Sequence, residues 1–505
     1  MASRDPNRPN ILFILSDDQG PWALNCAGTT ELQTPNLDRL ATTGIRFENF
    51  FCTSPVCSPA RASILTGQLP SQHGVQDFLR AGNSNHTANL EALDDTKINT
   101  TKKDELTGLD GKSIEFLQGR QTYTNVLTEN GYDCALSGKW HIGASAIPQA
   151  GFQYWNVHAG GAGNYYDAYM FTDGDLYKSK GYFSDVITDN AISYLDSNRQ
   201  SSTPFSLNVH FTAPHAPWGR EQHPAEYYQD YFTNCAFDTV RWDPLHPDQL
   251  YKQGSSGTVP TTESARREIL SGYFAAITAM DANIGRLLDW LEANDLRDNT
   301  LIIFTSDNGM SMGHHGIWGK GNGTYPANMF ETAVKVPTII SRPGHVPANS
   351  IEHQLLSHYD FFPTILDYTN VCGNSDSSLP GHSFSDLLQG NQLSHEFPVV
   401  VFEEYGPTRM IRTKSMKYIR RHSADPNELY DLLEDPLEVV NEIDNPKYAD
   451  QLLQMETQLQ NWFDSYVEPE HDGSKQPVKG RGQIGQIGVD REAFAQDVTF
   501  LRDVK

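Results

Sequence analysis

The chain has 505 residues and a formal net charge of −25 at pH 7, which argues against nucleic acid and anionic membranes as partners of its overall surface. Hydrophobic residues make up 38% of the chain and aromatic residues 11%, so we expect a folded protein rather than a disordered one. A chain of this length is expected to form one large domain and a smaller one. An anionic substrate remains compatible with the net charge, because a local cationic pocket can lie in an acidic protein.

The cysteines and the N-terminus bear on the cellular compartment. The six cysteines form no Cys-x-x-Cys pair, so neither a zinc site nor a disulfide framework is expected. Residues 1–9 are polar and lack the apolar run of a secretory signal. The protein is therefore expected to be cytoplasmic, or periplasmic or secreted with a leader outside this sequence. No stretch reaches the length and apolarity of a membrane span, so no membrane partner is expected.

The first chemical signal follows the first predicted strand. Residues 10–15 form a continuous apolar run, which predicts a strand buried on both faces. Asp17 and Asp18 follow it directly, at the carboxyl end of the strand, where open α/β sheets place their sites. The pair is consistent with a polar turn. It is equally consistent with a site for a hard divalent cation, whose charge would offset the repulsion between the two carboxylates.

The second signal is a cysteine at the start of a predicted helix. A strand predicted over residues 45–51 leads to Cys57, and Pro59 suits a first helical position. Cys57 is then expected just before the helix N-terminus, with Arg61 about one turn later on the same face. Because a helix start and a guanidinium both stabilise negative charge, we expect Cys57 to be a reactive thiol. The alternative is a buried structural cysteine beside a surface arginine.

Three more predicted strands each end in polar groups. The strands cover residues 132–136, 205–211 and 301–305. Buried strands that alternate with helices predict an α/β fold with a large, mostly parallel or mixed sheet flanked by helices. The groups that follow these strands should meet the two aspartates at one edge of the sheet. They are Lys139, His141, His215, Asp307 and Asn308, and Lys320 follows in a glycine-rich loop.

The segments between these strands are less informative. Residues 80–120 are polar and predict an insertion over the site or a surface excursion, and residues 218–261 predict a long rim loop. Residues 263–294 have helical periodicity, and their apolar stripe is interpreted as core alone. Several side chains in or near these loops are hypothesised to bind substrate, local packing being the alternative. They are His73, Trp218, Arg220, His314, His315 and Trp318.

The pattern of predicted elements changes near residue 393 to short strands and a final helix. We expect a catalytic domain over residues 1–392 and a smaller C-terminal α+β subdomain over 393–466, with an antiparallel sheet and a final amphipathic helix. The tail, residues 467–505, is expected to wrap the body, to wrap a second subunit in a homo-oligomer, or to be disordered. Its composition does not separate these alternatives.

The stretch around Cys57 resembles a known family signature. Cys-x-Pro-x-Arg followed by Ala-Ser-x-Leu-Thr-Gly, residues 57–67, resembles the signature of the type I sulfatases in the alkaline-phosphatase superfamily. The resemblance extends from about Pro9 to Phe463, with further motifs in the family's order. It implies an alkaline-phosphatase-like fold and oxidation of Cys57 by a maturation enzyme to formylglycine, an aldehyde whose hydrate attacks sulfur.

The resemblance also implies a metal site. Asp17, Asp18, Asp307 and Asn308 would bind one Ca²⁺ ion, with residue 57 as a further ligand through an oxygen. Three carboxylates and an amide suit Ca²⁺ or Mg²⁺, and Ca²⁺ is the better expectation.

The remaining roles concern charge and protons. Arg61, Lys139 and Lys320 would neutralise the sulfuryl oxygens, and His215 or Lys320 would protonate the leaving oxygen. His141 would take a proton from the hydrated aldehyde, so that sulfate leaves and the aldehyde is regenerated, while Asp307 would act as base in the attack.

Three functions remain open on the sequence. The first is a sulfatase acting on a sulfated saccharide or another small sulfate ester. The second is a phosphonate monoester or phosphodiester hydrolase with the same site. The third is a binding protein with an inactive site, which is disfavoured because no position of the family's constellation is visibly substituted.

Overall fold

The protein is described here from a computed structural model. It describes residues 7–83, 113–250, 259–371, 378–405, 407–422, 426–476, 482–490 and 492–494. The sequence expectation for residues 80–120 therefore lies largely outside the described residues. Among the residues that are described, no helix combines the length and the apolar composition needed to cross a membrane.

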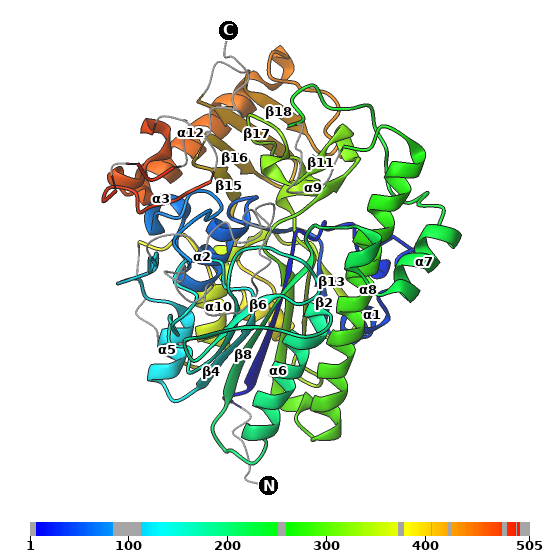
Figure 1. Cartoon of the computed structure of the whole chain (residues 1–505). Coiled ribbons are helices and arrows are strands. Elements are labelled where there is room, and N and C mark those ends of the chain that lie inside the picture. The colour runs from blue at the N-terminus through cyan, green and yellow to red at the C-terminus, as the bar shows by residue number, and fades with distance from the viewer. Residues whose placement is uncertain are drawn as a thin grey trace.

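A ten-stranded sheet forms the centre of the molecule (Figure 1). Strand β1 lies in its middle, parallel to β8 on one side and β9 on the other, and all eight of its residues are buried. In spatial order the strands are β13 (Ser350–Glu352), β2 (Ile45–Phe47), β12 (Thr338–Ser341), β9 (Thr300–Ser306), β1 (Asn10–Asp17), β8 (Phe205–Pro214), β4 (Asp133–Gly138), β5 (Tyr154–His158), β6 (Tyr169–Thr172) and β7 (Asp175–Lys178). The central strands are parallel, and antiparallel pairs occur at β12, β6 and β7.

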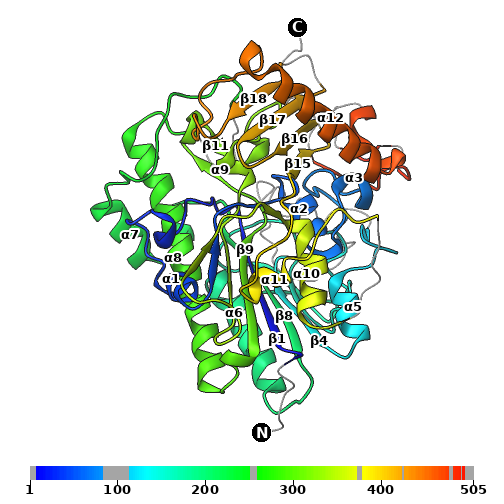
Figure 2. The same ribbon diagram turned by 180° about the vertical axis from the view of Figure 1, so that it is seen from behind.

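Helices cover both faces of this sheet. One face carries α1 (Pro35–Thr42), α6 (Phe183–Asn198) and the long α8 (Glu263–Ala293), against which α7 (Ala225–Asn234) packs. The other face carries α2 (Cys57–Thr66), α5 (Tyr123–Glu129), α10 (Phe361–Tyr368) and α11 (Ser385–Leu388), seen from behind in Figure 2. Short helices α3 (Pro70–His73) and α9 (Glu331–Val334) lie near the C-terminal sheet. The predicted α/β fold is confirmed.

A second, antiparallel sheet follows in the chain. Its strands are β15 (Val399–Glu403), β16 (Thr408–Arg412), β17 (Met416–Arg421) and β18 (Glu428–Asp431), and α12 (Ala449–Tyr466) packs on it. Two small pairs complete the strands: β3 (Phe50–Phe51) with β14 (Leu356–Ser357), and β10 (Ser311–Met312) with β11 (Trp318–Gly319). The antiparallel sheet and final helix were expected, while the exact division at residues 392 and 466 stays a prediction.

The described part of the tail returns to the catalytic body. Gln483 forms a parallel bridge with Leu79, and the Phe494 ring stacks on Tyr405 with 3.9 Å between ring centroids. A segment more than 400 residues away along the chain therefore forms part of the wall beside Leu79.

Three sequence expectations differ locally from the structure. The segment 45–51 is two strands, β2 and β3, rather than one. Helix α2 begins at Cys57 itself, so Pro59 is its third residue. No N–H of the first helical turn needs an intrahelical partner, so a proline is tolerated there too. The expected rim loop over 218–261 contains helix α7, whose buried Tyr228 and Tyr231 face α8.

Candidate active site at the carboxyl edge of the central sheet

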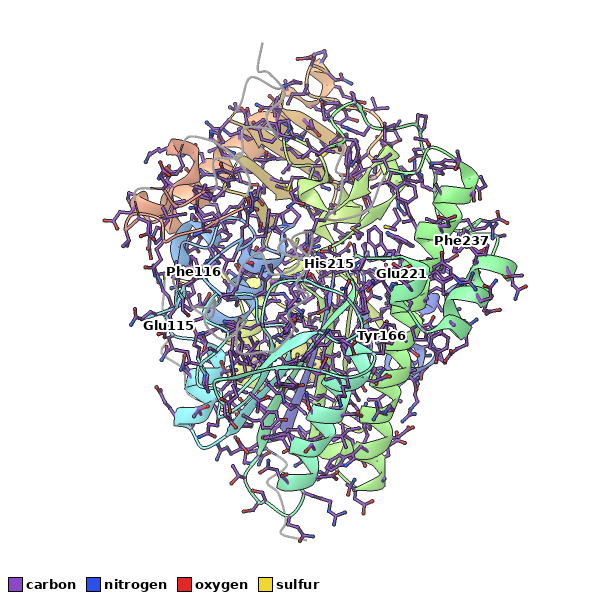
Figure 3. All side chains as sticks on the ribbon, in the orientation of Figure 1. Glu115, Phe116, Tyr166, His215, Glu221 and Phe237 are labelled. Atoms are coloured by element: carbon purple, nitrogen blue, oxygen red, sulfur yellow. The ribbon has the colours of Figure 1, made fainter. Side chains whose placement is uncertain are left out.

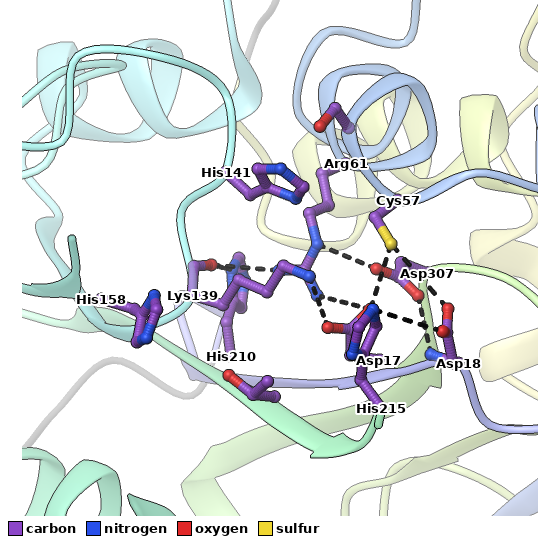
Figure 4. A network of polar contacts seen from close by, with 12 residues as sticks. Asp17, Asp18, Cys57, Arg61, Lys139, His141, His158, His210, His215 and Asp307 are labelled. Carbon is purple, nitrogen blue, oxygen red and sulfur yellow. Dashed lines mark hydrogen bonds and ion pairs between the residues drawn. The ribbon is translucent and has the colours of Figure 1, made fainter. Parts of the chain in front are cut away.

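The carboxyl ends of four central strands meet below helix α2. Asp17 ends β1, and Asp18 follows it in the left-handed region at φ +62°. Lys139 follows β4, and His215 follows β8. Asp307 and Asn308 follow β9, and Cys57 begins α2 above them. The structure thus brings together the side chains that the sequence placed at strand ends (Figure 4).

Four acidic or sulfur ligands form the centre of this site. One ligand atom from each of Asp17, Asp18, Cys57 and Asp307 lies within 4.8 Å of the others, and all four residues are buried. Asn308 donates from Nδ2 to Asp18 Oδ1 at 2.8 Å. The Asn308 Oδ1 atom is buried and has no hydrogen-bond partner among the described residues. Since a buried amide oxygen normally has a partner, this oxygen is available to a cation.

Three cationic side chains neutralise the carboxylates. Lys139 Nζ lies 2.5 Å from Asp17 Oδ2, and Lys320 Nζ lies 2.6 Å from Asp18 Oδ1. Arg61 donates from Nε to Asp307 Oδ2 at 2.9 Å and from Nη1 to the Lys139 carbonyl at 3.0 Å. Its Nη2 is buried and has no hydrogen-bond partner among the described residues, although it lies 3.9 Å from Asp17 Oδ1. All three cations therefore face the same small volume.

The thiol of Cys57 differs from the sequence expectation. Burial and the neighbouring Asp17 raise the pKa of the thiol well above its usual value, although Lys139 and Lys320 act in the opposite direction. Lys320 Nζ lies 2.6 Å from Sγ. The expectation of a reactive thiolate is therefore wrong for the unmodified side chain, because desolvation outweighs the helix start and the cations.

His141 is held as a neutral base. Its Nε2 lies 3.1 Å from the Leu79 carbonyl, which can only accept, so this nitrogen carries the proton. Nδ1 is buried and unpartnered among the described residues. Burial, with Lys139 and Arg61 nearby, lowers the pKa of His141 well below its usual value. Gly161 is required beside the ring, because a Cβ there would lie 2.2 Å from Nε2.

His215 follows β8 and lies beside Asp18. Its Nδ1 donates to the Ala216 carbonyl at 2.7 Å, and its Nε2 lies 3.6 Å from Asp18 Oδ2. Burial lowers the pKa of His215 to about 4, even though Asp18 acts to raise it. The ring is thus directed at the site by its own backbone neighbour.

Three residues that sequence reasoning did not assign support this arrangement. Tyr273, interpreted as core alone, donates its hydroxyl to the Asp18 carbonyl at 2.9 Å and accepts from the Gly20 amide at 3.0 Å. The ring nitrogens of His210 and His358 lie 3.1 Å from the Lys139 carbonyl and 3.0 Å from the Ser306 carbonyl. A tyrosine in an apolar helical stripe gives no sequence signal of this role.

A cavity of about 930 Å³ opens above the site. Its lining includes Asp18, Cys57, His141, His215 and Lys320, and it continues past Trp218 and Arg220 toward α7 and α8. Figure 3 labels His215 and Glu221 near this region. Two of the residues hypothesised to bind substrate, Trp218 and Arg220, therefore line the cavity.

The other four hypothesised substrate residues do not belong to the cavity lining. His73 is buried, with Nε2 3.1 Å from Ser63 Oγ and Nδ1 accepting from the Val75 amide. The remaining three pack against other aromatic or apolar side chains: His314 on Trp22, His315 on Phe330, and Trp318 within the cluster around α8. The structure gives these four residues packing contacts, and their role in substrate binding stays a prediction.

The wall formed by Phe78, Leu79 and Arg80 is fixed by the tail. The Gln483 backbone donates to Phe78 O and accepts from the Arg80 amide, both at 2.9 Å. The buried Gln483 side chain accepts from the Gln76 amide at 2.8 Å and donates to Gly74 O at 2.9 Å. The tail therefore holds the same loop whose Leu79 carbonyl orients His141.

Comparison with known proteins agrees with this geometry. The family profile described as sulfatase matches residues 9–371, and the profile described as N-sulphoglucosamine sulphohydrolase, C-terminal, matches residues 313–464. The first covers the whole central sheet and every residue of the candidate site.

Individual relatives are similar over most of their length. An N-acetylglucosamine-6-O-sulfatase of Bacteroides thetaiotaomicron is 28% identical, over 95% of this chain and 90% of that protein. A choline-sulfatase of Rhizobium meliloti is 27% identical, over 87% of this chain and 83% of that protein. A solved structure of a protein in complex with its substrate D-glucosamine-2-N,6-O-disulfate has a TM-score of 0.74 and 26% identity, covering 93% of this chain and all of that one. The chain belongs to the sulfatase family of enzymes.

Proposed function

We propose that this sulfatase hydrolyses sulfate esters of carbohydrates, with a formylglycine made from Cys57 as nucleophile and one bound Ca²⁺ ion. The observation that carries the proposal is the buried group of Asp17, Asp18, Asp307 and Cys57, with ligand atoms within 4.8 Å of one another. Asp18 and Cys57 line the cavity, and we call the whole group, with Arg61, Lys139 and Lys320, the cavity floor. The three carboxylates repel each other, and Arg61, Lys139 and Lys320 offset this repulsion.

The donor set fits a hard cation. Asp17, Asp18, Asp307 and the unpartnered Oδ1 of Asn308 would hold it, because carboxylate and amide oxygens are preferred by Ca²⁺. When bound, the ion lowers the pKa of a coordinated hydroxyl and polarises an S–O bond. The hydrated aldehyde derived from Cys57 supplies the attacking oxygen, which an unmodified, buried thiol does not.

The cations of the site bind and orient the sulfate group. Lys320 lines the cavity beside Asp18, and Lys139 lies beside Asp17 beneath it. Arg61 Nη2 lies 3.9 Å from Asp17 Oδ1 and has no hydrogen-bond partner among the described residues. A sulfate held between them has its three peripheral oxygens opposite positive charge. Since the site is buried, such charges act at low dielectric and stabilise the developing charge strongly.

Lys320 and the two histidines are assigned the proton transfers. Lys320 stays protonated beside Asp18 and is placed to deliver a proton to the leaving alkoxide. His215 can share this role only in its protonated form, because its neutral ring has the proton on Nδ1, bonded to the Ala216 carbonyl. His141 is neutral with Nδ1 unpartnered among the described residues, so it accepts the proton of the second hydroxyl when sulfate leaves. Asp307 is the base assigned to the first hydroxyl.

The carbohydrate assignment rests on the relatives and on cavity size. The first relative acts on N-acetylglucosamine-6-O-sulfate by its name, and the aligned solved structure holds a glucosamine disulfate. A cavity of about 930 Å³ exceeds what a sulfate group alone occupies. Another relative is named a choline-sulfatase, so small alkyl sulfates are the substrates against which sugar sulfates should be compared.

The test uses protein co-expressed with a formylglycine-generating enzyme and loaded with Ca²⁺, and it measures sulfate release from sulfate esters and phenol release from a phosphonate ester. The substrates are N-acetylglucosamine 6-sulfate, N-acetylgalactosamine 6-sulfate, choline sulfate, phenyl sulfate and the monophenyl ester of phenylphosphonic acid, called phenyl phosphonate below. We expect release from at least one sugar sulfate at a kcat/KM above those for choline sulfate and phenyl phosphonate. Faster hydrolysis of choline sulfate overturns the carbohydrate assignment, and faster phenyl phosphonate hydrolysis overturns the sulfate ester assignment.

A further inference from the structure

The cavity has a second part, which we call the α7–α8 arm, lined by Trp218, Tyr228, Phe232, Ile269 and Met310. These are apolar or aromatic side chains, and none takes part in the chemistry proposed above. The Tyr228 and Phe232 rings are nearly parallel, at 13° with 6.1 Å between centroids. Phe232 is half-buried, so one side of this ring pair is accessible from the cavity. Such a surface stacks on a flat, uncharged ring.

The rim of the α7–α8 arm carries negative charge. Glu221 and Glu268 line the cavity and are exposed, and neither carboxylate has an ion-pair partner among the described residues. Arg220 lines the same rim. A Cβ on Gly219 would lie 2.4 Å from Glu221 Oε1, so this carboxylate folds back against the loop that enters the arm. Glu221 lies on the α7–α8 side of His215 in Figure 3.

The arm and the reaction centre are one continuous cavity, so one substrate can occupy both. A second sulfate or a carboxylate in the arm would meet two carboxylates against one arginine. A neutral ring would instead cover the Tyr228–Phe232 surface and remove apolar area from water. Discrimination follows from both effects, since repulsion rejects the charged group and stacking retains the neutral one.

We propose that the α7–α8 arm is a specificity subsite for an uncharged ring attached to the sulfated sugar, which makes singly sulfated, otherwise neutral glycosides the substrate class. This rests on the proposed function. It differs from the preference that a doubly sulfated glucosamine, the substrate of the aligned solved structure, would imply.

The experiment compares three substrates on the calcium-loaded, formylglycine-bearing enzyme: methyl N-acetylglucosaminide 6-sulfate, its phenyl glycoside, and D-glucosamine-2-N,6-O-disulfate. If another singly sulfated sugar is hydrolysed faster in the release assay, its methyl, phenyl and disulfated forms are used. We expect kcat/KM for the phenyl glycoside to exceed that for the methyl glycoside about tenfold, a typical size for one aromatic contact. The disulfate should be the poorest of the three.

Two variants assign the preference to the arm. Phe232→Ala should reduce the phenyl-to-methyl ratio of kcat/KM to near one. Glu268→Lys should raise the disulfate-to-methyl ratio about threefold by replacing repulsion with attraction in a solvent-exposed rim. Glu226→Lys is the matched control, because Glu226 is exposed on α7 but is not part of the cavity lining. It changes net charge equally and should leave both ratios unaltered.

The outcomes separate the two proposals. Sulfate release without a phenyl preference, or with the disulfate preferred, overturns the subsite and leaves the sulfatase assignment in place. A shift of the disulfate ratio in Glu226→Lys as large as in Glu268→Lys attributes the effect to net charge and also overturns it. No release from any sulfate ester by verified formylglycine protein overturns the proposed function itself.

Discussion

The floor of the cavity and the α7–α8 arm differ in whether their charged groups are buried and paired. At the floor Asp17 and Lys139 are completely buried, and their charges lie 2.5 Å apart. In the arm Glu221 and Glu268 are exposed and unpaired among the described residues, beside the accessible Phe232 ring. Charges interact strongly where water is excluded and weakly where it is not. Rate should therefore depend on the floor, and choice among substrates on the arm.

This difference indicates which positions of the cavity tolerate substitution. Replacing a buried, paired charge disturbs every partner that it neutralises, so changes at the floor are costly. Replacing a rim carboxylate or a half-buried ring disturbs little else, since solvent fills the place of the lost side chain. The predictions below probe this contrast from the largest expected effect to the smallest.

Substitution of Cys57 should abolish sulfate release with every substrate. Cys57→Ala removes the precursor of the nucleophile at the cavity floor, and no neighbouring group replaces it. Intact-mass analysis of the wild-type peptide should show a loss of about 18 Da on conversion to the aldehyde. Cys134→Ala is the matched control, because Cys134 is buried in β4 and free. It should retain release, and loss of activity in both variants would contradict a special role for Cys57.

Removal of calcium should affect both activity and stability. An ion that binds the folded site of Asp17, Asp18 and Asp307 but not the unfolded chain stabilises the fold, so its removal lowers the free energy of unfolding. Protein stripped with a chelator should lose sulfate release, and added Ca²⁺ should raise Tm. Saturation at a hundred times the dissociation constant contributes about 2.7 kcal/mol. In Asn308→Leu the calcium-dependent rise in Tm should shrink, and an undiminished rise would remove Asn308 from the ligand set.

The floor was largely predictable from the sequence, because its aspartates and Lys139 follow buried strands and Cys57 and Arg61 belong to a family signature. Asp17 and Asp307 come directly after apolar runs, and parallel strands deliver their carboxyl ends to one edge. The α/β fold follows from the same alternation. The roles assigned to individual residues stay predictions, since proximity does not establish which proton each one moves.

Three other features could not be predicted from strand ends: the α7–α8 arm, the hydrogen bond from Tyr273 to Asp18, and the contact of the tail with the cavity wall. Tyr228 and Phe232 lie on a helix in a segment expected to be a loop, because its helical pattern is only ten residues long. Tyr273 reads as a core residue in sequence, although its hydroxyl holds Asp18. Gln483 contacts residues about 400 positions away, and no local pattern encodes such a pairing. These features depend on tertiary packing.

His141→Ala should lower kcat by about a hundredfold or more, the usual contribution of a positioned proton acceptor. His141 is placed to reset the nucleophile, so turnover should fall while the first turnover persists. Rapid-mixing kinetics should therefore show a burst followed by a slow phase. His73→Ala is the comparison, because His73 is equally buried but lies outside the cavity lining. It should lower Tm and leave kcat/KM close to wild type, and equal loss of kcat would contradict this contrast.

Gln483→Ala should have the smallest effect on rate. Gln483 holds the loop of Phe78, Leu79 and Arg80, which forms the cavity wall next to His141. The variant leaves the Gln76 amide and the Gly74 carbonyl without their partners, which costs about 1–3 kcal/mol of unfolding free energy. Because the same loop presents Leu79 O to His141, we expect kcat/KM to fall about tenfold. Val489→Ala, at a tail position that is 75% exposed, should change neither quantity. If Gln483→Ala lowers Tm without changing kcat/KM, the tail stabilises the fold but does not position His141, and the wall then belongs with the tolerant arm rather than with the floor.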